Sequence, residues 1–324
     1  MNHRSCSWVR AAGAVALAAV SGLAAAFPDK PVTLVVPYPP GGATDTVARI
    51  MAKGLTQRLK QTVIVDNRAG AGTVIGAGAV AQAAPDGHTL LISSNTPFTV
   101  NPALKPKLPY DPLKSFESIG LLGTSPLVLL AHPSLPANSV AELVALAKSR
   151  PGKLSYASFG NGTTSHFAGE MFKLMTGADI LHVPYKGSAP AMQDLIGGQV
   201  QLSFDTNVAA IPQMQAGKVK GIAVTALKPS PSLPKLPSIA QSGYPDYEMV
   251  PWITIVAPRG LNATARTVLS KAFADTLADA GVRAELEKVG IDVAYEPPSA
   301  YDARVARELP RLRAYVHKAG LTAD

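Results

Sequence analysis

Three turns of the sequence share a design that can hold an anion. Each follows an apolar, strand-like run, contains small or glycine residues, and leads into a segment with helical periodicity. The turns are residues 38–45 (YPPGGATD), 158–166 (SFGNGTTSH) and 185–190 (YKGSAP). The first N–H groups of a helix have no intrahelical partner and lie at the positive end of the helix dipole, so they attract anions. Any one turn also fits an ordinary strand-to-helix connection, but three in one chain favour a shared anion site.

Three ionisable residues accompany these turns. Asp45 lies in the first turn of its expected helix, where it can cap or complement the helix (about 0.5–2 kcal/mol), order the loop, or accept a ligand amine. His166 lies at a helix start, where a lone histidine most often makes local hydrogen bonds. Asp205 directly follows the strand-like run 201–204. It is therefore expected at the carboxyl end of a strand, where open α/β sheets bind ligands.

Other kinds of site find little support. Gly70, Gly72 and Gly76 follow a strand-like run, but their G-x-G-x-x-x-G spacing differs by one residue from the dinucleotide-binding motif, and no acidic residue ends a strand about 20 residues later. There is no G-x-S-x-G motif, and the histidines show no metal-ligand spacing. We expect no cofactor, no metal and no catalytic residue. A hydrolase that uses either His166 or a catalytic pair brought together only by the fold stays an alternative.

The elements that must position these turns alternate between strand and helix. Strand-like runs at 32–36, 62–65 and 89–92, with a helical pattern over 44–59, predict a parallel, covered sheet. A long extended segment at 119–130 precedes a second round of alternation. A second extended segment at 249–257 then leads to two closing helices, at 263–280 and from Ser299 onward. Two such crossings predict two lobes joined by a two-strand hinge, with lobe 1 formed by residues 27–121 and 253–324 and lobe 2 by residues 122–252.

The first 26 residues have the pattern of a secretory signal peptide. Arg4 and Arg10 precede the alanine-rich apolar run 11–26, which ends in three alanines and is shorter than the roughly 18–20 residues that span a bilayer. We expect export to the periplasm with cleavage near Ala26. Cys6 lies before the apolar run, so no lipid anchor is expected.

The charge of the remaining chain gives no sign of a nucleic-acid partner. After residue 26 there are 28 basic and 22 acidic residues, a net charge of +6. The basic residues are scattered, without a basic run or interleaved aromatic side chains, which is typical of a solvated surface.

Several blocks in a fixed order make the sequence resemble the Bug family, the extracytoplasmic solute receptors of tripartite tricarboxylate transporters. Together they extend over nearly the whole chain after residue 26. The blocks are residues 27–42 with Asp45, 66–72, 84–90, 160–163 with His166, 183–187, 204–205, 236–243 and Trp252.

The resemblance implies an α/β fold of the periplasmic binding protein type II kind, with a ligand cleft between the lobes. It implies a monomeric periplasmic receptor, not an enzyme, that binds a small carboxylate for the membrane components of such a transporter. A sensory receptor for a signalling system is the alternative. The ligand contacts that the resemblance implies are Tyr38, Gly41, Gly42, Thr44, Asp45, Ser94 and Asn95 from lobe 1, and Asn161, Thr163, His166, Gly187 and Asp205 from lobe 2. Ala43, Ser188 and the loop 205–210 depart from the expected family pattern.

Overall fold

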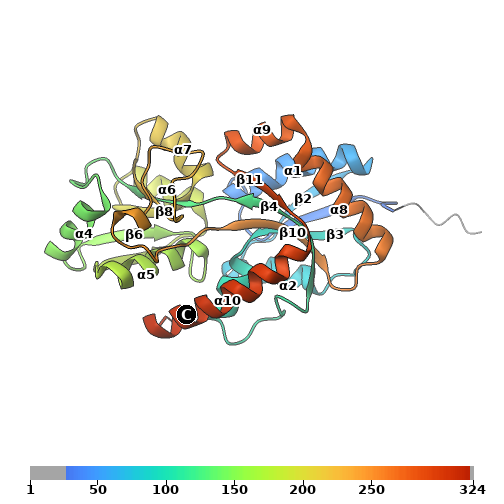
Figure 1. Ribbon diagram of the computed structural model, residues 1–324, viewed down its shortest axis with the longest axis horizontal. Coiled ribbons are helices and arrows are strands. Elements are labelled where there is room, and N and C mark those ends of the chain that lie inside the picture. Colours follow the sequence, from blue (N-terminus) through green and yellow to red (C-terminus); the bar gives the residue numbers. More distant parts are fainter. Residues whose placement is uncertain (1–26, 322–324) are drawn as a thin grey trace, which may run out of the picture.

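The computed structural model describes residues 27–321, which form two α/β units, each built around one twisted sheet (Figure 1). The predicted α/β class is confirmed, whereas the predicted signal peptide lies outside the described residues. No helix within residues 27–321 is long and apolar enough to cross a membrane.

The first unit contains a six-stranded sheet in the order β11-β4-β10-β3-β1-β2. Its strands are β1 (Val32–Val36), β2 (Val63–Asn67), β3 (Thr89–Ser94), β4 (Phe116–Thr124), β10 (Trp252–Pro258) and β11 (Asp292–Glu296). β1 pairs in parallel with β2 and β3, as the sequence pattern predicts, and β10 runs antiparallel between β3 and β4. The helical elements of this part of the chain are α1 (Ala43–Leu59), η1 (Ala71–Thr73), α2 (Val74–Ala81), η2 (Thr96–Val100), α3 (Asn101–Leu104), α8 (Ala263–Ala278), α9 (Ala280–Lys288) and α10 (Ser299–Ala319).

The second unit contains a five-stranded sheet in the order β7-β6-β8-β5-β9. Its strands are β5 (Leu127–Ala131), β6 (Leu154–Ser158), β7 (Ile180–Pro184), β8 (Leu202–Thr206) and β9 (Lys220–Val224). Its helical elements are α4 (Val140–Ser149), α5 (Thr164–Thr176), α6 (Ser188–Ile196), α7 (Asn207–Gln215) and η3 (Ala240–Ser242).

Alternation along the central strands builds a core on each face of each sheet. In β5, Leu127 and Leu129 belong to one buried cluster, and Val128 and Leu130 to the cluster on the opposite face. Successive side chains of a strand point to opposite faces, so a strand that is apolar at every position must be covered on both sides. Both faces of the second sheet therefore carry a buried apolar core.

The two crossings between the units lie side by side. β4 and β10 pair from Phe116↔Pro258 to Thr124↔Trp252, and the N–H of Ser125 donates to the carbonyl of Pro251 at 2.9 Å. The expected single extended segment at 119–130 is interrupted at residues 125–126, where the chain passes from β4 into β5. The division of the chain into lobes at residues 121 and 252 stays a prediction.

The C-terminal third differs from the prediction. The expected helix at 263–280 is α8, which ends at Ala278. A further helix, α9, follows it without having been predicted, because the Asp279 side chain accepts hydrogen bonds from the N–H groups of Gly281 and Val282 and starts a new helix there. The pattern also missed β11, a five-residue strand at the edge of the first sheet.

The final helix, α10, packs on both units. Tyr301 and Val305 belong to a core cluster of the first unit, whereas Leu312 belongs to a core cluster of the second. The ring of Tyr315 lies 5.2 Å from that of Phe167 on α5. In Figure 1, α10 runs along the molecule beneath the point where the chain crosses between the sheets.

Candidate functional site

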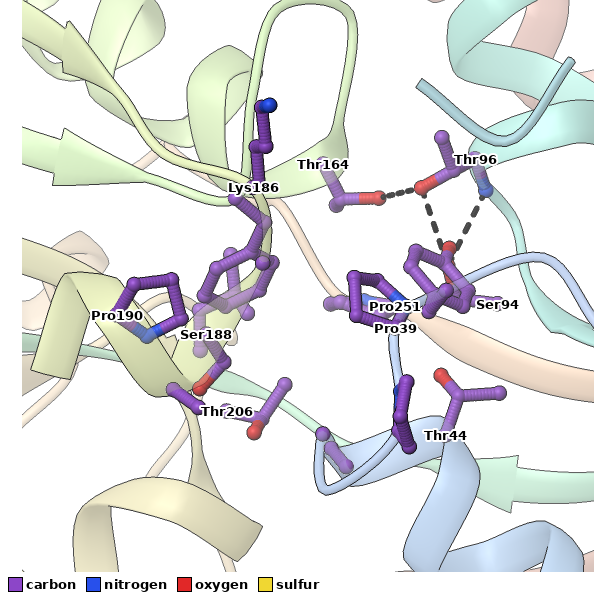
Figure 2. Close-up of a pocket in the computed structure, with 18 residues that line it drawn as sticks. Pro39, Thr44, Ser94, Thr96, Thr164, Lys186, Ser188, Pro190, Thr206 and Pro251 are labelled. Carbon is purple, nitrogen blue, oxygen red and sulfur yellow. Dashed lines mark hydrogen bonds between the residues drawn. The ribbon is translucent and has the colours of Figure 1, made fainter. Parts of the chain in front are cut away.

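A cavity of about 100 Å³ lies between the two units, where four helices begin. Figure 2 shows side chains of the second unit, such as Ser188, Pro190 and Thr206, facing side chains of the first across the cavity. The lining residues are Tyr38, Pro39, Pro40, Gly42, Ala43, Thr44, Ser94, Thr96, Leu127, Phe159, Thr164, Lys186, Gly187, Ser188, Ala189, Pro190, Thr206 and Pro251.

Two of these helices begin without a side-chain cap. α1 starts after Gly42 and α6 after Gly187, and neither glycine can supply a side-chain oxygen to the first N–H groups. Gly187 has φ +112°, and a Cβ atom there would approach Pro39 across the cavity at 3.3 Å. The backbone conformation and the close approach of the two units therefore both favour glycine at this position. The uncapped N–H groups leave room for an anionic group to act as the cap.

The other two helices have threonine caps. Thr163 accepts a hydrogen bond from the N–H of His166 at the start of α5, and Thr206 accepts one from the N–H of Ala209 at the start of α7. Each cap satisfies one of the several free N–H groups of its helix. The cavity therefore lies at the positive ends of four helix dipoles.

A chain of hydroxyl groups extends along one side of the cavity and joins the two units. The Tyr38 hydroxyl lies 2.7 Å from Ser94 Oγ, which lies 3.1 Å from Thr96 Oγ1. Thr96 Oγ1 lies 2.8 Å from Thr164 Oγ1 on the other unit, and Thr164 donates to Asn95 Oδ1 at 3.2 Å. Because Thr164 donates to Asn95, Thr96 can donate to Thr164, Ser94 to Thr96, and Tyr38 to Ser94. Such chains strengthen one another in a low-dielectric interior.

The chain is supported by the C-terminal helix. The Asn95 amide donates to Glu308 of α10 at 3.5 Å, and the Trp252 indole N–H donates to the same carboxylate oxygen at 2.8 Å. Glu308 therefore fixes the orientation of Asn95, and through it the contact between Thr96 and Thr164.

Asp45 orders the first loop. Its carboxylate accepts hydrogen bonds from the Gly41 N–H at 2.9 Å, from Arg49 at 3.0 Å and from Asn67 at 3.0 Å. Burial alone would raise the pKa of Asp45, but these hydrogen bonds outweigh it and lower the pKa. Of the three roles that the sequence leaves open, this geometry favours ordering of the loop.

His166 is turned away from the cavity. Its Nδ1 accepts the Gly162 N–H at 3.2 Å, and its ring stacks on His182 at 4.2 Å. Burial lowers the pKa of His166 and lowers that of His182 to about 3, so both rings are neutral near pH 7. The His182 Nε2 lies 2.6 Å from Ser158 Oγ. The pair therefore supports residues 158–162 from behind.

Asp205 lies at the carboxyl end of β8 and is fully buried. Its two oxygens accept the Ser188 hydroxyl, each at 2.9 Å, and Oδ1 also accepts the Thr206 N–H at 2.8 Å. Burial raises the pKa of Asp205 to about 7. Asp205 does not line the cavity itself, but Ser188 and Thr206, which it contacts, do.

The ligand contacts expected from the sequence fall into two main groups in the structure. Tyr38, Gly42, Thr44, Ser94 and Gly187 line the cavity. A second group lies behind the lining or at its edge and holds it in place: Gly41, Asp45, Asn95, Thr163, His166 and Asp205. Asn161 is exposed and does not line the cavity. Its backbone carbonyl lies against Gly72 of the first unit, so close that a Cβ atom on Gly72 would be 2.7 Å from the carbonyl oxygen.

Several lining residues were not predicted as contacts. Nine of them lie within the three glycine-containing turns that the sequence singles out, so the turns themselves were the signal: Pro39, Pro40, Ala43, Phe159, Thr164, Lys186, Ser188, Ala189 and Pro190. Thr96 and Thr206 each follow a predicted contact, and Leu127 and Pro251 belong to the crossing segments. Lys186 is exposed, and Figure 2 shows its ammonium group pointing away from the other labelled side chains.

The sequence matches a known receptor family. The family model described as "Tripartite tricarboxylate transporter family receptor" matches residues 47–321. The chain belongs to this receptor family. The resemblance to Bug proteins is confirmed by BugT of Bordetella pertussis, which is 35% identical to this receptor over 308 residues, 93% of this chain and 94% of BugT.

Solved structures of similar proteins have the same fold. MatC from Rhodopseudomonas palustris, with bound malate, superimposes on this receptor with a TM-score of 0.83 at 33% identity, over 90% of this chain and 100% of MatC. An R. palustris protein with adipate gives a TM-score of 0.87 at 36% identity, over 91% of this chain and 99% of that protein. The predicted fold of two α/β lobes is thereby confirmed.

The buried Asp205 makes stability depend on pH. Its folded pKa of about 7 lies above its ordinary value of 3.8, so the folded state holds the proton more tightly and stability falls as pH rises from about 4 to about 7. Asp205→Asn cannot ionise. We expect its free energy of unfolding, relative to that of the parent protein, to increase by roughly 3 kcal/mol between pH 4.5 and pH 8, as measured by urea unfolding.

Asp246→Asn is the control, because Asp246 is exposed and its replacement should leave the difference nearly constant with pH. A constant difference for Asp205→Asn as well would mean that Asp205 titrates as an ordinary surface carboxylate.

Proposed function

We propose that this receptor captures a small carboxylate in the cavity between its two units and delivers it to the membrane components of a tripartite tricarboxylate-type transporter. The convergence of four helix starts on one cavity carries the proposal, because their free N–H groups offer several donors to one anionic group. Family membership adds the transport role, and the bound malate and adipate of the similar proteins make a carboxylate the anion to test.

Capture requires contacts to both units. α1 and the hydroxyls of Tyr38, Ser94 and Thr96 belong to the first unit, whereas α5, α6 and α7 begin on the second. A ligand that contacts both units stabilises the arrangement in which they are close, and so shifts the equilibrium between open and closed states. The closed state is then the one that the membrane components recognise.

The remaining parts of the proposal concern location and chemistry. We place the receptor in the periplasm as a monomer, released from its signal peptide near Ala26. We propose no catalytic role, because His166, the one residue singled out for a hydrolase, is engaged with Gly162 and His182 behind the cavity wall.

A thermal-shift screen tests the proposal. The protein, refolded to remove any carried ligand, is heated with mono- and dicarboxylates of two to eight carbons and with the matching uncharged amides. Because binding to the native state stabilises it by about 2.7 kcal/mol at a ligand concentration of 100 times Kd, we expect at least one acid to raise Tm by several degrees. The matching amide should not. The absence of any shift across the acids would contradict the proposal.

Gly187→Ala should weaken the binding of any acid found in this way. The added Cβ is strained at φ +112° and would meet Pro39 of the first unit at 3.3 Å, so the units could not approach as closely. We expect Kd, measured by titration calorimetry, to rise at least tenfold. Gly217→Ala is the matched control, with a similar left-handed strain at φ +67° but open space around it. An equal loss of affinity in both variants would argue against the cavity.

Thr164→Val should weaken binding more modestly. It removes the hydroxyl that bonds to Thr96 and Asn95 across the units while keeping the shape of the side chain. A hydrogen bond contributes about 0.5–1.5 kcal/mol, so we expect Kd to rise about 2- to 10-fold. Thr176→Val, at the far end of α5, loses a buried hydroxyl bond to Phe172 and should leave Kd unchanged. An unchanged Kd for Thr164→Val would mean that the hydrogen bond between Thr164 and Thr96 does not contribute to the ligand-bound state.

A further inference from the structure

The Ser188 hydroxyl lies between the buried Asp205 and the cavity. Ser188 is the first residue of α6 and lines the cavity, and its Oγ lies 2.9 Å from both carboxylate oxygens of Asp205. Asp205 is fully buried, and its other hydrogen-bond partner is Thr206, whose N–H donates to Oδ1 and whose hydroxyl also bonds to the carboxylate. Above its pKa of about 7, Asp205 is ionised, and a carboxylate oxygen accepts hydrogen bonds and donates none, so the single proton of Ser188 then points at Asp205.

No cation among the described residues balances this carboxylate. Within residues 27–321, Asp205 takes part in no ion pair, and the neighbouring β5 and α7 carry no charged side chain. Lys186, two residues before Ser188, points away from the labelled cavity side chains in Figure 2. An unpaired buried charge attracts any positive or proton-donating group that comes within reach.

The direction of the Ser188 proton decides what Ser188 offers to a ligand. A hydroxyl has one proton and two acceptor lone pairs. With the proton committed to Asp205, Ser188 presents only lone pairs to the cavity. A ligand carboxylate oxygen would meet an acceptor there, whereas a ligand hydroxyl or ammonium group would find a partner polarised by the charge behind it.

The backbone next to Ser188 has the opposite preference. The N–H groups at the start of α6 are uncapped and donate, so they suit a carboxylate. Donors and an acceptor therefore lie side by side on one turn. A ligand that matches both carries a carboxylate and, close to it, a hydrogen-bond donor.

We infer that the Ser188–Asp205 pair makes this receptor select carboxylates that bear a hydroxyl or ammonium group near the carboxylate over the same acids without it. This inference rests on the proposed function and specifies the ligand class for the same cavity.

Two substitutions separate this role from simple packing. Ser188→Ala removes the acceptor and leaves the backbone N–H groups in place. Asp205→Asn keeps the shape, removes the negative charge and supplies an amide N–H that can donate to Ser188 Oγ, so the Ser188 proton is no longer committed to a charged partner. The second variant therefore weakens Ser188 as an acceptor and allows it to donate into the cavity without removing any lining atom.

The experiment compares matched acids of equal chain length by titration calorimetry at pH 8. The sets are propionate, lactate and alanine; succinate, malate and aspartate; and glutarate, 2-hydroxyglutarate and glutamate, with both enantiomers of each chiral acid. In at least one set we expect the parent protein to bind the hydroxy or amino acid at least tenfold more tightly than the plain acid. Ser188→Ala should reduce this ratio to within about threefold, and Asp205→Asn should abolish it.

Ser238→Ala is the matched control, because Ser238 is also buried in the second unit and donates to the Leu227 carbonyl away from the cavity. It should keep the parent ratio. Plain acids that bind as tightly as substituted ones in every set, or a ratio that survives Ser188→Ala, would overturn the inference while leaving the proposed function intact. If no acid binds at all, in these sets or in the thermal-shift screen, the proposed function fails and the inference fails with it.

Discussion

The first backbone N–H groups of α1, α5, α6 and α7 open onto one small space between the two units. These groups have no carbonyl partner within their helices, and water, a side-chain cap or a ligand must satisfy them. Threonine caps serve two of the helices in part, whereas the glycines that precede the other two supply no cap. The sheets, the loops and the two crossings all place these four helix starts together. The main consequence of the fold is therefore that backbone N–H groups without partners gather around one cavity.

The charges near the cavity are arranged so that they do not compete for those donors. Asp45 is turned toward Arg49 and Asn67, and Glu308 is held by Trp252. Asp205 is covered by Ser188. A carboxylate that pointed directly into the space would cap the helices itself and exclude an anionic ligand. The polar part of the lining therefore consists of helix N–H groups, hydroxyl groups and Lys186, beside apolar residues such as Leu127 and Phe159, and the acidic groups lie behind the wall.

The sequence predicts the repeated units of this fold well and their irregular parts poorly. Apolar runs such as Val32–Val36 and the helical spacing in α1 locate the parallel strands and their helices, because burial on a covered sheet leaves a periodic pattern. The break between α8 and α9 depends on one aspartate bonding to two N–H groups, and β11 exists because β4 has a free edge to pair with. Such features arise from local hydrogen bonds and tertiary pairing, neither of which leaves a period.

The site shows the same division. The glycine-containing turns and Asp205 are visible in the sequence, because glycine and the ends of strands have general physical consequences. The contacts of Thr96 with Thr164 and of Gly187 with Pro39 join residues 68 and 148 positions apart, and only the packing of the two units brings them together. The cover of Asp205 by Ser188 depends on the packing of α6 beside β8 within the second unit, which the sequence does not reveal. The bond of His166 to Gly162 is, by contrast, the kind of local hydrogen bond that a histidine at a helix start predicts.

The course of α10 limits how far the two units can move apart. Its first turns are packed into the first unit through Tyr301 and Val305, while its last turns contact the second through Leu312 and Tyr315. A separation of the sheets about the paired crossings must either slide Tyr315 off Phe167 or keep that contact and rotate about the helix. The C-terminal helix is therefore a third connection between the units, besides the two crossings, and its contacts must change in any movement that separates the sheets.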